Sequence, residues 1–217
     1  MNKLLRKEFS LAMHPTVPLM MLLAPMVLIP NYPYTVVMFY TTMGIFFTCL
    51  SGRENNDIIY SLNLPVAKKD IVKARFIYAV ILELIQLTLM IPFAVINHNI
   101  NSAGNQAGMD ANISLFALGF IVYGIFNLVF FSSYYKNVNK VGSSFLKSSI
   151  AVFAVTAAEV ISTYAVPFVK NVLDTADPQF LMQKLIFLLA GAAIFLFLTF
   201  ISYRRSVTVF EKQDLNQ

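Results

Sequence analysis

The chain has 217 residues, of which 58% are hydrophobic and only 12% are charged. Soluble domains are on average about 45–50% apolar and about 25% charged, so one soluble core of this length could not bury the excess. The composition therefore excludes an ordinary soluble enzyme and predicts an integral membrane protein. The single cysteine, Cys49, excludes an internal disulfide and a CxxC metal or redox motif.

The N-terminal segment has an amphipathic pattern over about residues 1–13. On a helix, apolar residues such as Leu4 and Phe9 fall on one arc and basic residues such as Lys7 fall on the other, while Glu8 is the exception. This pattern predicts a helix lying in the membrane interface. A cytosolic extension that continues into the first span stays open as an alternative.

Six mostly apolar blocks have the length of about 17–25 residues that is needed to cross a bilayer. We predict spans at 11–30, 34–50, 75–96, 113–135, 148–168 and 181–203. The prolines crowded into the first block predict kinks or an incomplete crossing. The blocks are too long for buried β-strands, so the predicted fold is an all-α membrane protein with a single transmembrane domain.

The placement of positive charge predicts the orientation. All 16 Lys and Arg residues except Lys170 and Lys184 fall in segments that lie on one side of a six-span topology. The positive-inside rule therefore places both termini in the cytoplasm. Tyrosines near the predicted span ends are expected to form aromatic belts at the lipid headgroups, namely Tyr32, Tyr34, Tyr134, Tyr135 and Tyr203.

The connection between the second and third spans contains a short predicted helix. It covers Asp57 to Leu64 and ends at Pro65. A second helix is expected to begin near Ala67, with Asp70 in its first turn, and to run on into the third span. Such a helix, held at the cytoplasmic face before a proline hinge, can be pushed as a rigid unit. Alternatively, it is a plain connector whose apolar residues rest on the membrane.

The run from Asp57 to Phe76, D-x-x-Y-S-L-x-L-P-V-A-x-K-D-I-V-x-A-R-F, resembles a segment of the permease subunits of type 2 ABC exporters. The layout of an N-terminal elbow helix and six spans resembles the same family. The resemblance implies that segment 52–74 carries a coupling helix that docks on a separate ATPase subunit. The residues that it assigns to this coupling are Asp57, Ile58, Tyr60, Leu62, Leu64, Pro65 and Asp70. Ala67 departs from the family, which usually has Ser or Thr at this position.

The chain resembles most the small stand-alone members of this family, some of which export amphipathic peptides such as phenol-soluble modulins. This resemblance implies a bacterial cytoplasmic-membrane permease that pairs with a second copy or a paralogue and moves peptides out of the cytoplasm or inner leaflet. The sequence has no P-loop, so ATP and magnesium are expected on the partner ATPase. No cofactor, metal site, catalytic residue or nucleic-acid partner is expected for this chain.

Two acidic residues lie within predicted spans, Glu83 in the third and Glu159 in the fifth. Ionisable side chains at this depth are costly and usually face protein or water. Gln86 shares a helical face with Glu83, and Thr156 and Ser162 lie near Glu159. These five residues are candidates for lining a translocation path, or else each acid makes an interhelical hydrogen bond as a protonated carboxyl.

Other functions remain open at this point. In a secondary transporter or channel, Glu83 or Glu159 would carry protons. An integral membrane enzyme is disfavoured because the sequence has no catalytic constellation. Three acids in the connections between spans, Asp110, Asp174 and Asp177, are expected to be solvated loop charges.

Overall fold

The computed structural model describes residues 2–101 and 104–213, and the described part is helical with no strand. The long helices are α3 (Thr35–Glu54), α5 (Lys68–Ile100), α6 (Ile113–Tyr134), α7 (Val141–Ala165) and α8 (Leu181–Glu211). All five are long and apolar enough to cross a membrane. The predicted all-α membrane fold is therefore confirmed.

The first predicted span is broken into short helices. The helix α1 (Asn2–Lys7) continues as a π-helix, η1 (Glu8–Ala12), and is followed by α2 (Thr16–Met21) and a 3-10 helix, η2 (Ala24–Leu28). The segment 2–12 is bent by 85° from the segment 16–28. Prolines in this region remove backbone donors, which explains why no continuous helix forms. The right-angle bend is the geometry expected of an interfacial helix that precedes a span.

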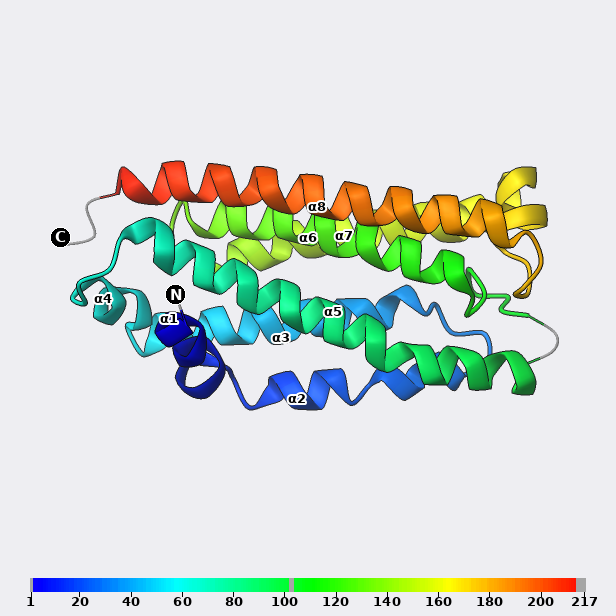
Figure 1. Cartoon of the computed structure of the whole chain (residues 1–217), viewed down its shortest axis with the longest axis horizontal. Helices are drawn as coiled ribbons and strands as arrows, with labels where there is room; N and C mark the ends of the chain where they lie inside the picture. Colours follow the sequence, from blue (N-terminus) through cyan, green and yellow to red (C-terminus); the bar gives the residue numbers. More distant parts are fainter. Residues whose placement is uncertain (1, 102–103, 214–217) are drawn as a thin grey trace.

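The described ends of the chain lie at the same end of the helical bundle (Figure 1). The short helix α4 (Asp57–Leu62) lies there too, so we call this the terminal end. The connections from α5 to α6 and from α7 to α8 lie at the other end, called here the opposite end. The second connection contains a short π-helix, η3 (Val169–Leu173).

Glycines allow α6 and α8 to lie side by side along the bundle (Figure 1). A Cβ added at Gly191 of α8 would lie 2.5 Å from the carbonyl oxygen of Ala117 in α6. A Cβ at Gly124 would lie 3.0 Å from the Cα of Phe195. Small residues at these positions therefore permit backbone approach that any larger residue would prevent.

The aromatic-belt prediction is wrong for Tyr34, Tyr134 and Tyr135, each of which is 1% exposed in the bundle core. The ring of Tyr134 stacks on that of Phe130 with a centroid distance of 5.8 Å. These tyrosines lie near helix ends, but their positions on the helix direct them toward other helices. Burial of their large rings contributes to the packing of the core.

Candidate functional site

An ionic cluster at the terminal end joins three segments that are distant in sequence. The Nε of Arg75, in the second turn of α5, lies 2.6 Å from Oε2 of Glu8, the first residue of η1. The Nη2 of Arg75 lies 2.6 Å from Oδ2 of Asp57, the first residue of α4. Lys7 Nζ lies 2.5 Å from Asp57 Oδ1 and 3.5 Å from Glu8 Oε1. The cluster thus ties the N-terminal helix to α4 and α5.

This cluster is buried and electrically balanced. The side chains of Arg75 and Glu8 are 4% and 2% exposed, and those of Lys7 and Asp57 are both 11% exposed. Two carboxylates face two cations, which is the arrangement that a low-dielectric site requires. Lys7 Nζ also donates a hydrogen bond to Ser61 Oγ at 2.7 Å, so α4 is held along its length.

The local backbone places Asp57 in this cluster. Asn56 has a left-handed conformation, with φ of 52°, and turns the chain sharply from α3 into α4. Gly52 of α3 lies directly beside the cluster, since a Cβ there would be in ordinary van der Waals contact with Asp57 Oδ2 at 3.6 Å and Arg75 Nη1 at 3.8 Å.

The two faces of α4 differ. Ile58 and Ser61 are buried on the face that carries the ionic cluster, whereas Ile59 and Tyr60 are 49% and 61% exposed. Of the residues assigned to coupling by resemblance, the exposed ones are Tyr60 and Pro65, the half-buried ones are Asp57, Leu62, Leu64 and Asp70, and Ile58 is buried. The outward surface of α4 therefore centres on Ile59 and Tyr60.

Glu8, Lys7 and Arg75 were not among the predicted site residues. The sequence contained one signal for them: Glu8 interrupts the apolar arc of the N-terminal helix, and Arg75 begins an apolar span. An unpaired charge in either position would be costly, so each one requires a partner of opposite sign.

Glu83 and Gln86 lie together on the buried face of α5. Glu83 Oε2 accepts a hydrogen bond of 3.0 Å from Nδ2 of Asn127 in α6, which also donates to Thr199 Oγ1 in α8 at 3.2 Å. Within the described residues, the other oxygen of Glu83 and both polar atoms of the Gln86 amide have no hydrogen-bond partner. This polar cluster, which we call the Glu83 cluster, therefore keeps unused hydrogen-bonding capacity inside an apolar bundle.

Glu159 lies toward the opposite end and binds the connection from α5 to α6. Its Oε1 accepts a hydrogen bond of 2.6 Å from the backbone N–H of Met109, and its Oε2 accepts one of 3.4 Å from Thr35 Oγ1. A Cβ on Gly108 would lie 2.6 Å from Glu159 Oε1, so glycine allows this close approach. Ser162 Oγ donates to the backbone carbonyl of Glu159 at 2.8 Å.

The structure does not bring the five candidate path residues into one site. Glu83 and Gln86 lie on α5, where Glu83 bonds to α6, whereas Glu159 and Ser162 lie on α7, where Glu159 bonds to α3 and to a loop. Thr156 is buried on α7, one turn before Glu159. The two acids therefore have separate structural surroundings.

At the opposite end, acidic side chains bind backbone groups of the two connections. Asp174 Oδ1 accepts a hydrogen bond of 2.7 Å from the backbone N–H of Asp110, and Asp177 Oδ1 pairs with Lys184 Nζ at 2.8 Å. Burial raises the pKa of Asp174 to about 7. Burial also raises the pKa of Asp110. The expectation that these acids are solvated loop charges is wrong, because all three are half-buried and bound. Asp174 joins the two connections, Asp177 pairs with Lys184, and the Asp110 carboxylate accepts a hydrogen bond from Asn105 of its own connection.

In the described part of the chain, no group of three or more His, Cys, Asp or Glu side chains could hold a metal ion.

Comparison with known proteins gives one match. The chain matches the family described as ABC-2 family transporter protein over residues 3–211. No curated protein and no solved structure matches it. The family match covers most of the N-terminal helix α1, the short helices that follow it and all five long helices, so it applies to the whole bundle and not to one motif. The chain therefore belongs to the ABC-2 transporter family and is a multi-pass permease component of an ABC transporter.

Proposed function

We propose that this chain is the permease subunit of an ATP-driven exporter of hydrophobic or amphipathic peptides in a bacterial cytoplasmic membrane. Two permeases, either two copies or this chain and a paralogue, pair with ABC ATPase subunits that bind ATP and magnesium. The terminal end faces the cytoplasm, because it carries nearly all of the Lys and Arg residues. Membership of the ABC-2 family supports the ATPase partner.

The arrangement of α4 is the observation that carries this proposal. Its outward surface exposes Ile59 and Tyr60 at the end of the bundle, where a partner ATPase would dock. Its inner face is joined to α5 through Asp57 and Arg75. Because charged partners fix the inner face, a push on the outward surface moves α4 with the base of α5 and does not merely deform a loop. We infer that this is the route by which ATPase closure moves the spans.

The peptide substrate is proposed from the resemblance of the chain to the small stand-alone members of the family, some of which export amphipathic peptides. The Glu83 cluster supports it, because Glu83 and Gln86 supply unused polar groups within an apolar bundle. Glu83 and Gln86 are fully buried, so a peptide would meet this carboxyl group only after movement of α5 relative to α6 and α8 exposes it.

The proposal is tested by purifying the tagged chain from its native cells in mild detergent and measuring the retained ATPase. The double variant Ile59→Ala/Tyr60→Ala is expected to lose the partner and its ATPase activity. The matched control is Leu146→Ala, which truncates a 63% exposed apolar side chain on α7. Equal ATPase retention by variant and control would exclude α4 as the docking surface.

Substrate and energy source require a second measurement, namely peptide export from cells or vesicles. If peptide export requires both ATP and the partner ATPase, the exporter proposal is supported. A chain that purifies alone and transports in response to a pH gradient, with loss of flux in Glu83→Gln or Glu159→Gln, would instead establish the secondary transporter.

A further inference from the structure

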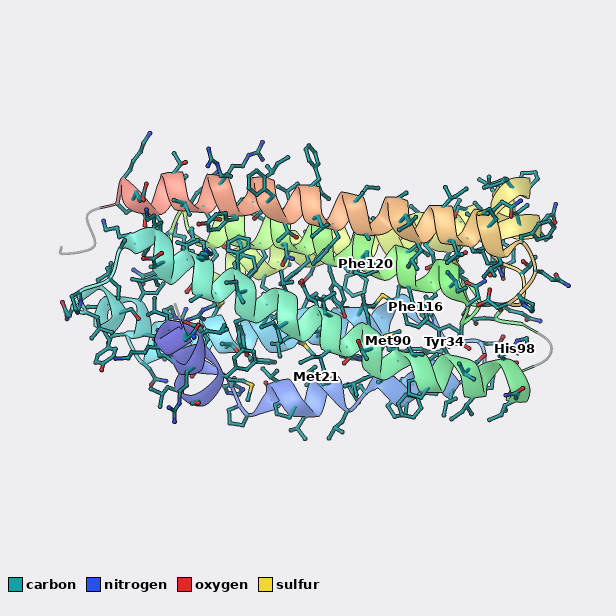
Figure 2. All side chains as sticks on the ribbon, viewed as in Figure 1. Met21, Tyr34, Met90, His98, Phe116 and Phe120 are labelled. Carbon is teal, nitrogen blue, oxygen red and sulfur yellow. The ribbon has the colours of Figure 1, made fainter. Side chains whose placement is uncertain are left out.

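A groove of about 1120 Å³ opens between α5, α6 and α8 toward the opposite end of the bundle. Small-molecule sites typically have about 300–1,000 Å³, so the groove is large enough for a sizeable ligand. Its deeper walls are apolar and are formed by Leu84, Leu87, Ile91, Phe116, Phe120 and Leu188. Figure 2 shows Phe116 and Phe120 on the side of α6 that faces α5, with His98 near the outer end of α5.

The fold itself builds this groove. Pro92 lies inside α5 and cannot donate the backbone hydrogen bond that a helix expects at that position. Beyond it, Asn97 Nδ2 donates to the carbonyl oxygen of Val27 at 2.7 Å and to Tyr34 Oη at 2.9 Å. The outer end of α5 is therefore fastened to the first span, while α6 is packed closely on α8. The space between α5 and α6 stays open as a result.

The α5 wall of the groove is apolar and faces outward. Ile91 and Val95 are 50% and 61% exposed, and both lie in a helix that is long and apolar enough to cross a membrane, so we expect lipid beside this wall. Water gains no hydrogen bonds from such walls, and an empty space would forfeit the dispersion contacts of every lining atom. An acyl chain is the occupant that the bilayer supplies at this position and that satisfies these walls.

The rim of the groove carries negative charge. Asp110 and Asp177 are its two carboxylates, and His98 is the only side chain in the described lining that can be positively charged. Asp177 is already paired with Lys184. Asp110 accepts a backbone hydrogen bond of 2.5 Å from Asn105, and it makes no ion pair within the described residues. A half-buried carboxylate of this kind is stabilised by an ammonium group and repels a phosphate that has no amine beside it.

We propose that this groove is a binding site for one membrane lipid with an amine headgroup, whose acyl chain packs on Phe116 and Phe120 and whose ammonium group binds Asp110. The site does not depend on the exporter proposal, because it uses neither α4 nor a partner ATPase. It lies on the side of the bundle formed by α5, α6 and α8, away from the ionic cluster at the terminal end.

The test is native mass spectrometry of the purified, delipidated chain titrated with phosphatidylethanolamine or phosphatidylglycerol. We expect one tightly retained phosphatidylethanolamine and weaker retention of phosphatidylglycerol. Asp110→Asn is expected to weaken phosphatidylethanolamine binding by about ten-fold and to leave phosphatidylglycerol unchanged, because it removes one charge-assisted contact. Equal binding of the two lipids, or no effect of Asp110→Asn, would overturn the headgroup assignment.

The acyl-chain site is tested by filling the groove. Thr88→Phe/Val95→Phe places two rings seven residues apart on its α5 wall and should abolish tight binding. The matched control, Ala154→Phe/Ile161→Phe, has the same spacing on the exposed face of α7 and should bind as the native chain does. Equal binding by both double variants would overturn the proposal, as would displacement of the lipid by an amphipathic cationic peptide at equal concentration. If the filled variant does not fold, as judged by circular dichroism, Asp110→Asn still decides the question.

Discussion

Replacement of Arg75 by Met is the sharpest test of the ionic cluster. The change keeps an unbranched apolar stem but removes the guanidinium, which lies 2.6 Å from both Glu8 and Asp57, and leaves these two acids sharing Lys7. Removing one partner from a buried ionic group typically costs about 3–5 kcal/mol, since it leaves a charge without compensation. We therefore expect Arg75→Met to lower the free energy of unfolding by about this amount.

A second substitution separates charge balance from side-chain packing. Glu8→Gln/Arg75→Met removes one negative and one positive charge, so that Lys7 and Asp57 remain as a neutral pair. If uncompensated charge causes the loss, the double variant should be more stable than the sum of the two single effects predicts. For contacting residues of one network, the coupling is about 0.5–3 kcal/mol.

The assay is equilibrium unfolding in mixed micelles, followed by far-ultraviolet circular dichroism because the chain has no Trp. The matched control is Arg53→Met, which breaks a 3.4 Å contact with Glu54 whose side chains are 37% and 63% exposed. Such exposed pairs contribute about 0–1 kcal/mol. The reasoning fails if Arg75→Met costs no more than Arg53→Met, or if the effects of Glu8→Gln and Arg75→Met are additive.

Three further predictions concern other parts of the bundle. Gly191→Ala should lower the free energy of unfolding by about 1–3 kcal/mol, because the added Cβ forces α8 away from α6. Gly142→Ala is the control, because its added Cβ meets nothing within 4 Å, and it should not destabilise the chain in the same unfolding assay. Asp174 has a pKa raised from 3.8 to about 7, so its contribution to stability should be lost as pH rises through 7. Thermal unfolding should therefore show lower stability at pH 8 than at pH 5, and Asp174→Asn should reduce this difference. Ala67→Ser should stabilise the start of α5 by about 1 kcal/mol, because the native N-cap residue, Ala67, makes no side-chain hydrogen bond and a serine hydroxyl can make one. An unchanged unfolding midpoint would contradict this.

The spans could be predicted because the bilayer imposes their length and apolar content, whereas the ends of the helices that carry them could not. The predicted third span ends at residue 96, whereas α5 continues to Ile100 because Asn97 finds partners in the first span. Similarly, α8 continues past residue 203 to Glu211. A helix ends where its backbone or capping groups require it, and a change from lipid to water does not by itself stop it.

The candidate site was only partly accessible to sequence analysis. Asp57 was identified, but its partners Lys7 and Arg75 lie in two other helices, and no periodicity or spacing links the three residues. The different surroundings of Glu83 and Glu159 could not be predicted for the same reason, because their hydrogen-bond partners come from other helices and from a loop. Sequence patterns show which face of a helix a residue occupies, whereas the fold decides what that face contacts.

The helix α5 connects the ionic cluster, the Glu83 cluster and the groove. Its 33 residues form a rod of about 50 Å, with Arg75 near one end, Glu83 two turns further along, and the groove wall from Leu84 outward. A displacement of α4 by a partner would reach Arg75 through Asp57 and would shift α5 relative to α6, where Glu83 meets Asn127. The same shift would change the width of the groove, because the outer part of α5 forms one wall and α6 forms the other. A lipid bound there would then resist or favour the movement, so occupancy of the groove and the action of α4 should be energetically coupled.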